Sequence, residues 1–298
     1  MRILLIGGTG QVGSEVFSAF NKNKIECISP SSKELDITDN RKIEATISNN
    51  LPLDFVINAS AYTAVDLAED ESDLAFAINR DGPQFLAQSC SKHGIPLLHI
   101  STDYVFDGSA LKPYVEEMEV SPLGIYGKSK ADGEQAIRQC LPAHIILRTA
   151  WVYGANGNNF VKTMLRLGQK HSELRVVGDQ AGCPTSAVDI ADTIIKLVKQ
   201  MQGTSKSDER WGTYHYCSAG STSWAEFAKK IFSAARKIMP SYPVTEVISI
   251  ATSEYPTKAT RPKYSVLDCR KITSTFAINA PLWSASLLRD SPNVLKNI

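Results

Sequence analysis

The first thirteen residues of the chain read MRILLIGGTGQVG (Met1–Gly13) and decide its fold. The short apolar run predicts a buried strand, and the Gly-x-x-Gly-x-x-Gly pattern directly after it predicts a tight turn into a helix. Gly7 permits the turn, Gly10 lets the backbone approach a pyrophosphate, and Gly13 allows close packing of the helix on the sheet. Free N–H groups at the start of that helix bind phosphates. The stretch predicts a dinucleotide site that includes Gln11 and Val12, with a plain glycine-rich turn as the alternative.

Strand-like and helix-like stretches alternate through the first half of the chain. Apolar runs predict strands at Arg2–Ile6, Ile25–Ile28, Phe55–Asn58, Leu97–Ser101 and His144–Arg148. Between them, helical spacing predicts helices at Gly10–Asn21, Asn40–Asn49, Ser72–His93 and Ile125–Cys140. This alternation predicts an α/β fold with a doubly wound parallel sheet of the Rossmann type.

The regular alternation weakens after Trp151. We expect residues 1–150 to form the dinucleotide-binding domain, with residues 187–217 returning to it as a helix (Ala187–Met201) and a strand (Thr213–Cys217). Residues 151–186 and 218–298 then form a smaller substrate-binding lobe. A helix is predicted at Trp224–Met239, and the many prolines of the tail predict loops with short elements.

Composition restricts the classes of protein to which the chain can belong. Its 298 residues are 43% hydrophobic and 21% charged, with 32 basic and 31 acidic residues. This balance gives no reason to expect nucleic acid or a membrane surface as a partner, and no apolar run is long enough to cross a bilayer. The six cysteines are scattered and the N-terminus has no signal-peptide pattern, so we expect reduced thiols and a cytoplasmic protein. The five dispersed histidines suggest no metal cluster.

The loop after the second predicted strand bears on the choice of cofactor. An NAD site usually places a carboxylate at the end of this strand, but here the chain reads Ser29-Pro30-Ser31-Ser32-Lys33. The hydroxyl of Ser31 and the charge of Lys33 suit a 2′-phosphate, which favours NADPH without excluding NADH; the alternative is a solvated turn. We expect Asp36 and Ile37 to pass under the adenine. The small side chains of Ala59, Ser60 and Ala61 should let the cofactor lie against the backbone.

A catalytic pair is predicted on the helix at Ile125–Cys140. Tyr126 and Lys130 are four residues apart and therefore lie on one helical face. A reductase must protonate the oxygen formed when hydride reaches a carbonyl carbon, and a nearby ammonium would lower the pKa of the tyrosine toward neutral pH. Thr102, at the end of the fourth strand, can hold the carbonyl oxygen. The alternative is an amphipathic helix with a lysine that extends to solvent.

Longer motifs along the chain are more specific than the glycine pattern or the Tyr-x-x-x-Lys spacing. They are Asn58–Asp66 (NASAYTAVD), Ser101–Gly108 (STDYVFDG), Tyr126–Lys130 (YGKSK), Arg148–Tyr153 (RTAWVY), Gly157–Phe160 (GNNF), Asp179-Gln180 with Pro184-Thr185, and Arg261-Pro262 with Ser265–Asp268 (SVLD). Together with the glycine pattern, they run nearly end to end and resemble the dTDP-4-dehydrorhamnose reductase family of the extended short-chain dehydrogenase/reductase superfamily. The resemblance implies NAD(P)H-dependent reduction of the C4 ketone of dTDP-4-dehydro-L-rhamnose.

The resemblance also implies roles for individual residues. Thr102 would bind the keto oxygen, Tyr126 would act as general acid, and Lys130 would tune Tyr126 and bind the nicotinamide ribose. Asp103, Tyr104 and Trp151 would line the sugar pocket, although Trp151 could equally be a core aromatic. Arg261 is a candidate partner of the diphosphate because arginine binds phosphate in bidentate fashion; the alternative is a surface arginine in a proline-bounded loop.

Some members of this family are described as homodimers with magnesium held by acidic side chains from both subunits. Glu15 matches one of those positions, but Val188 stands where a second carboxylate is expected, and Asp189 or Asp192 would have to replace it. We therefore assign no metal ligand and leave the homodimer open.

Two other functions compete with the reductase. A related nucleotide-sugar epimerase or dehydratase would keep its cofactor bound, and a dehydratase needs a second carboxylate where Tyr104 stands. A non-catalytic regulatory subunit on the same fold would have no need of Thr102, Tyr126 and Lys130 together.

Overall fold

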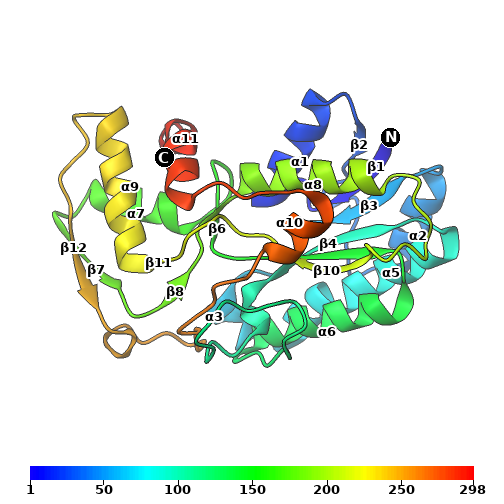
Figure 1. The fold of residues 1–298 in the computed structure, drawn as a ribbon, viewed down its shortest axis with the longest axis horizontal. Coiled ribbons are helices and arrows are strands. Elements are labelled where there is room, and N and C mark those ends of the chain that lie inside the picture. Colours follow the sequence, from blue (N-terminus) through cyan, green and yellow to red (C-terminus); the bar gives the residue numbers. More distant parts are fainter.

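Six parallel strands form the central sheet (Figure 1). The computed structural model describes residues 1–298, and its strands lie in the order β10-β5-β4-β3-β1-β2. Their bounds are β1 Arg2–Ile6, β2 Glu26–Ile28, β3 Phe55–Asn58, β4 Leu97–Thr102, β5 His144–Thr149 and β10 Gly212–His215. Each neighbouring pair is parallel. The predicted α/β fold with a doubly wound parallel sheet is confirmed.

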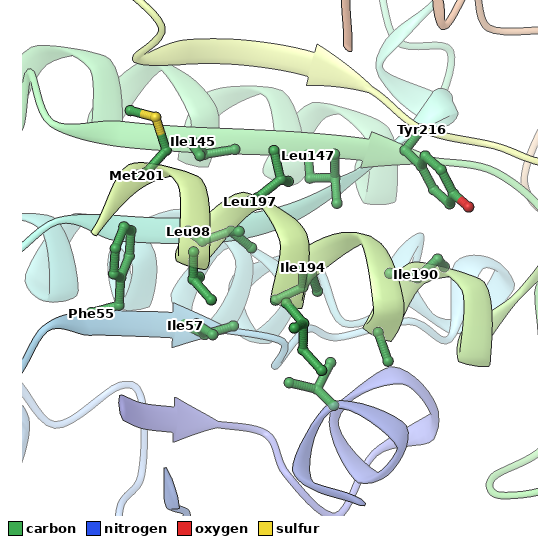
Figure 2. Close-up of a cluster of buried hydrophobic side chains, with 14 of the residues drawn as sticks. Phe55, Ile57, Leu98, Ile145, Leu147, Ile190, Ile194, Leu197, Met201 and Tyr216 are labelled. Atoms are coloured by element: carbon green, nitrogen blue, oxygen red, sulfur yellow. The ribbon is translucent and has the colours of Figure 1, made fainter. Parts of the chain in front are cut away.

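Helices cover both faces of the sheet because alternate side chains of each buried strand point to opposite sides. Ile3 and Leu5 of β1 pack with one apolar cluster, whereas Leu4 and Ile6 pack with another. The first face is covered by α1 (Gln11–Lys22), α8 (Ala187–Met201) and α10 (Arg270–Phe276). The second is covered by α2 (Asn40–Asn49), α5 (Gly82–His93) and α6 (Ile125–Cys140). Figure 2 shows α8 on the first face, where its apolar side chains meet those of β3, β4 and β5.

A second lobe lies beside the sheet, at the left of Figure 1. It contains α7 (Phe160–Gly168), β7 (Glu173–Val177), α9 (Trp224–Ile238), β12 (Glu246–Ile250) and α11 (Trp283–Leu295). Strands β7 and β12 pair in parallel, and the helices enclose a separate apolar cluster. Short pairs join β6 (Val152–Tyr153) to β9 (Thr185–Ser186), and β8 (Ala181–Gly182) to β11 (Thr222–Ser223). The remaining short elements are α3 (Val65–Ala68), α4 (Ser72–Phe76), η2 (Asp103–Val105) and η3 (Thr252–Glu254).

The predicted continuous helix at Ser72–His93 is interrupted by a π-helical turn, η1 (Ala77–Asp81). Pro83 has no N–H and cannot donate to the carbonyl of Asn79, so the regular α-helical ladder breaks there. That carbonyl instead lies against α6, where a Cβ on Gly133 would stand 2.1 Å from the Asn79 oxygen. The turn therefore helps to seat α6, the helix that carries Tyr126 and Lys130.

The prediction that the tail contains only loops and short elements is wrong for its last part. Residues Trp283–Leu295 form α11, a helix of 13 residues with Pro292 inside it. Leu287 and Val294 of this helix are buried in the cluster of the second lobe. Tertiary burial thus stabilises a helix that proline content argued against. None of the helices is long and apolar enough to cross a membrane.

Leu98 tests how strongly the sheet depends on the packing in Figure 2. Its side chain is fully buried in β4 between the strands and α8. Leu98→Ala should lower the free energy of unfolding by about 2–5 kcal/mol, because it removes apolar contacts and leaves a cavity. The control Leu111→Ala changes a side chain that is 97% exposed and should stay within about 0.5 kcal/mol of wild type. Equal urea unfolding curves for the two variants would contradict this packing.

Candidate active site

The candidate catalytic residues meet where β4 ends and α6 begins. Thr102 is the last residue of β4 and is buried, and Tyr126 lies in the first turn of α6. The helix packs tightly here, since a Cβ on Gly127 would lie 2.2 Å from the carbonyl oxygen of Tyr104. As a result the rings of Tyr104 and Tyr126 are in edge contact, with centroids 5.5 Å apart. The structure therefore brings together Thr102, Tyr104 and Tyr126.

Tyr126 does not have the lowered pKa that its spacing from Lys130 predicted. Burial raises the pKa of Tyr126 to about 12, the carboxyl group of Asp103 adds to the rise, and the Thr102 hydroxyl opposes it. The ammonium of Lys130 has other partners: its Nζ donates to the carbonyl oxygen of Ile100 at 2.7 Å and lies 3.1 Å from Nε2 of His99. Helical spacing placed the two side chains on one face, but the neighbouring strand decides where the lysine points.

Lys130 itself is buried, and burial lowers its pKa to about 8 despite the opposing effect of Glu134. A lysine with a pKa in this range can exchange a proton near neutral pH. The sequence analysis did not identify His99, which is fully buried in β4. The available signal was its position three residues before Thr102, between the apolar side chains of Leu98 and Ile100.

Glu134 anchors α6 to the sheet and was also not identified from the sequence. Its carboxylate accepts hydrogen bonds from Ser101 at 2.6 Å and from two nitrogens of Arg148 at 2.9 and 2.6 Å, and it also pairs with Arg138 at 2.7 Å. Burial alone would raise the pKa of Glu134, but these partners lower it to about 2. The useful signal was its place one helical turn after Lys130.

Asp103 carries an unusual carboxyl group beside Thr102. It is 1% exposed, it accepts a hydrogen bond from the Thr102 hydroxyl at 3.1 Å, and its Oδ2 has no hydrogen-bond partner. Burial raises the pKa of Asp103 to about 6, against the effect of nearby Ser265 and Thr102. The side chain is therefore more easily protonated than an ordinary aspartate.

The glycine loop has the shape that a dinucleotide phosphate needs. Gly10 caps α1 without any side-chain hydrogen bond, which leaves the first N–H groups of the helix available. Gly7 has a φ of 82°, and a Cβ on it would lie 2.6 Å from the Ser60 nitrogen; a Cβ on Gly13 would lie 2.0 Å from the Gly7 oxygen. Only glycine fits both positions, so this loop fits a dinucleotide cofactor.

Several other predicted cofactor residues surround this loop. Ala59, Ser60 and Ala61 follow β3 and are partly buried, and Val12 packs against the core. The side chain of Gln11 is held by the second lobe: it donates to the Val152 carbonyl at 2.9 Å and accepts from Asn159 at 2.8 Å. Gln11 thus connects the glycine loop to the second lobe.

The loop after β2 contains a carboxylate that the sequence analysis did not weigh. Glu34 folds back and accepts hydrogen bonds from the backbone N–H and hydroxyl of Ser31 at 2.7 and 2.8 Å. Lys33 is exposed beside them. Asp36 is used locally, where it accepts from the N–H and hydroxyl of Thr38 at 2.9 and 2.8 Å, while Ile37 is buried. Ser31 is therefore already engaged, and Lys33 is the free cation of the predicted set.

Trp151 belongs to a stacked aromatic pair. Its ring lies on that of Trp224 with centroids 3.5 Å apart and an interplanar angle of 6°. Its backbone has a φ of 44°, and a Cβ on Gly182 would lie 2.3 Å from its ring. Trp151 packs on the apolar clusters and is partly exposed, and its role in a sugar pocket stays a prediction. The sequence gave no signal for Trp224.

Arg261 forms a two-pronged ion pair across the candidate site. Its guanidinium donates to the two carboxylate oxygens of Asp66 at 3.1 and 2.7 Å. Lys258 pairs with Asp70 close by, so residues 258–261 are tied to α3 and the segment after it. A narrow pocket lies beside this contact and is lined by Tyr104 and Tyr126 among others. The predicted arginine therefore lies beside a pocket that Tyr126 lines, but the carboxylate of Asp66 already holds it.

Comparison with known proteins identifies the family. The family model described as the RmlD substrate binding domain matches residues 1–292. A dTDP-4-dehydrorhamnose reductase of Sinorhizobium fredii is 42% identical over 97% of this chain and 96% of its own. The chain belongs to the dTDP-4-dehydrorhamnose reductase family. Its fold matches the crystal structure of the family member from Clostridium acetobutylicum with a TM-score of 0.91 and 39% identity, covering 99% of this chain and 100% of the other. The Bacillus anthracis member, in complex with NADP, gives a TM-score of 0.89 and 37% identity over 97% and 98% of the two chains.

The magnesium site described for some members of the reductase family does not fit this chain. Val188 supplies no ligand, and Arg289 already pairs with Asp189 at 2.6 Å and with Asp290 at 2.7 Å, while the Asp192 side chain is exposed. Glu15 has a pKa raised by burial and by Asp290. No group of three metal-binding side chains is assembled anywhere in the structure. We derive no step through a metal.

The raised pKa of Asp103 can be tested through the pH dependence of stability. Because its folded pKa, about 6, lies above the ordinary value of ~3.9, the folded state binds the proton more tightly than the unfolded state. Its contribution to stability is therefore present below about pH 4 and is lost as the pH rises through 6. Asp103→Asn should gain stability relative to wild type between pH 4 and pH 8, by at most about 3 kcal/mol. Urea unfolding at both pH values measures this, with the exposed Asp192→Asn as control. An unchanged difference between Asp103→Asn and wild type would contradict it.

Proposed function

We propose that this protein reduces the C4 ketone of dTDP-4-dehydro-L-rhamnose to give dTDP-L-rhamnose, the last step of dTDP-rhamnose biosynthesis, with NADPH as the reductant. The observation that carries the proposal is the convergence of Thr102, Tyr126 and buried Lys130 at the junction of β4 and α6. The family membership of the chain and its intact glycine loop support it.

The cofactor supplies hydride to C4 of the sugar, and the protein supplies the proton and the geometry. The Thr102 hydroxyl holds the keto oxygen, and the Tyr126 hydroxyl, which stays protonated because its pKa is about 12, donates the proton to that oxygen. Lys130 binds the nicotinamide ribose from the next turn of the helix. Gly10 and Gly13 let the helix N-terminus approach the pyrophosphate.

We assign sugar-nucleotide binding to the lobe formed by residues 151–186 and 218–298, with residues 1–150 and 187–217 binding the cofactor. Asp103, Tyr104 and Trp151 line the sugar pocket in this proposal. Arg261 binds the diphosphate in this proposal. Its guanidinium already donates to both carboxylate oxygens of Asp66, and a phosphate can accept the same two hydrogen bonds. Substrate must then compete with Asp66 for the arginine.

The proposed preference of the protein for NADPH over NADH depends on the charge of Lys33. Lys33 is exposed beside the Ser31 hydroxyl, where a 2′-phosphate would lie. The carboxylate of Glu34 lies on the same loop and would repel that phosphate if it stayed in place. The NADP complex of the Bacillus anthracis family member favours the phosphorylated cofactor.

Stoichiometry tests the reaction directly. A reductase must exchange its cofactor in every turnover, so purified protein should carry little bound nucleotide and should oxidise one NADPH for each sugar ketone reduced. The assay supplies dTDP-4-dehydro-L-rhamnose and counts both product and NADPH, with UDP- and GDP-linked 4-keto sugars as controls for the nucleotide. Sugar conversion without net NADPH loss, together with tightly bound NAD⁺, would make the protein an epimerase or dehydratase.

The proposed proton donor is tested by Tyr126→Phe. Loss of the phenolic hydroxyl should lower kcat by roughly 10²-fold or more, which is the scale of positioned acid catalysis, and should leave NADPH affinity nearly unchanged. Steady-state kinetics and NADPH titration measure the two quantities. The control Tyr255→Phe removes a hydroxyl from a ring that is 57% exposed and should keep wild-type turnover. Near wild-type kcat in folded Tyr126→Phe protein would rule out this role.

A further inference from the structure

A chain of three buried polar side chains leads from β3 to the catalytic lysine. Asn58 at the end of β3 and His99 in β4 are both fully buried, and Lys130 of α6 is 2% exposed. Nδ2 of Asn58 lies 3.0 Å from Nδ1 of His99, and Nε2 of His99 lies 3.1 Å from Nζ of Lys130. Buried polar groups of this kind are costly unless their donors and acceptors match.

The orientation of the Asn58 amide is fixed by its other partner. Its Oδ1 accepts hydrogen bonds from the backbone N–H of Ser60 at 3.0 Å and from the Ser60 hydroxyl at 2.7 Å. A backbone N–H can only donate, so the oxygen must face Ser60 and the NH₂ group must face His99. Asn58 therefore donates to Nδ1 of His99, which must be the unprotonated nitrogen.

This orientation determines what His99 offers to Lys130. Full burial keeps the imidazole neutral, because burial lowers the pKa of His99 well below its usual value. A neutral imidazole with an unprotonated Nδ1 carries its proton on Nε2. That N–H points at Nζ of Lys130, where only an uncharged amine has a lone pair to accept it. The amine can still donate to the Ile100 carbonyl at 2.7 Å.

We propose that Asn58 and His99 are positioning residues that hold the Nε2–H tautomer of the imidazole and thereby favour the uncharged form of Lys130. The other groups around the lysine do not favour the neutral amine. Glu134 on α6 supports the ammonium but is itself neutralised by Arg148 of β5 and by Arg138. The lowered pKa of Lys130, about 8, agrees with this inference. His99 thus tunes the lysine from β4, although it touches neither substrate nor cofactor.

The catalytic consequence of the Asn58–His99 pair rests on the proposed reductase activity. If the lysine acts as an ammonium there, turnover falls as the pH rises past the pKa of Lys130, and the Asn58–His99 pair sets that alkaline limit. The structural part of the inference does not depend on the reaction. It can be tested in the protein without substrate.

The decisive variant is Asn58→Asp. A carboxylate of the same shape still accepts hydrogen bonds from Ser60, and it also accepts one from a protonated Nδ1 of His99. The neutral imidazole then presents an unprotonated Nε2 to Lys130. The ammonium is then favoured, and the protonation midpoint of Lys130 should rise by about one pH unit, a tenfold change in its proton affinity. Asn58→Asp in a His99→Phe background is the matched control, because the added charge remains while the imidazole is gone. There the rise should fall to less than half.

Nuclear magnetic resonance measures both the tautomer of His99 and the protonation midpoint of Lys130 in the full-length protein. Ring ¹⁵N shifts, assigned with His99→Phe, give the tautomer of His99, and side-chain ¹³C shifts give the titration of Lys130. In the wild-type protein we expect the Nε2–H tautomer of His99, and this measurement does not depend on the folding of any variant. In Asn58→Asp we expect a protonated Nδ1. A wild-type Nδ1–H tautomer, or a lysine midpoint that Asn58→Asp does not raise, or an equal rise without the imidazole, would overturn the inference.

The kinetic consequence is measured separately. The alkaline limb of kcat/KM for NADPH-dependent reduction should move upward with Asn58→Asp by the same amount as the lysine midpoint. If the limb stays while the midpoint moves, Lys130 does not act as an ammonium, and the kinetic part of the inference is overturned. If the protein reduces none of the 4-keto sugars, the proposed function fails, while the tautomer and the lysine titration still decide the structural part.

Discussion

The buried ion pair between Glu134 and Arg148 is the constraint on which the candidate site depends. It joins α6 to β5, and the bond from Ser101 to the same carboxylate joins α6 to β4. These contacts set the height of α6 over the sheet, and so they place Tyr126 and Lys130 relative to Thr102. A buried pair of charges has a large desolvation cost, and removing one partner would leave the other uncompensated. We regard the pair as a device for precise placement, with little net gain in stability.

The cofactor half and the substrate half of the site are built in different ways. The glycine loop is closely packed because Gly7, Gly13 and the backbone after β3 leave no space for side chains. The half to which we assign the substrate is held by side chains from distant segments, among them the Trp151–Trp224 stack and the Asp66–Arg261 ion pair. Gln11 connects the two halves through Val152 and Asn159. Asn156 adds a second link, since its side chain donates to the Ser14 hydroxyl at 3.1 Å.

Electrostatics at the junction of β4 and α6 follow from burial more than from neighbouring charge. Burial raises the pKa of Tyr126 and of Asp103, and it lowers the pKa of Lys130 and of His99. All four shifts are toward the neutral form: at pH 7 Tyr126 and His99 are neutral, whereas Asp103 and Lys130, with pKa values of about 6 and about 8, stay mostly charged. A neutral Tyr126 suits the transfer of a proton to an oxygen that develops charge only during reaction.

The sequence by itself determined the features that depend on local pattern. The glycine spacing and the apolar strands identified the fold, and the four-residue spacing of Tyr126 and Lys130 pointed to the helix of the candidate catalytic pair, because each pattern is fixed by backbone geometry over a few residues. Only the tertiary structure decided which side chains meet across elements. It directed Lys130 to His99, Arg261 to Asp66, and Arg289 to the carboxylates near Val188, and it formed α11 in a proline-containing tail. Those contacts join residues far apart in the chain, and no local spacing records them.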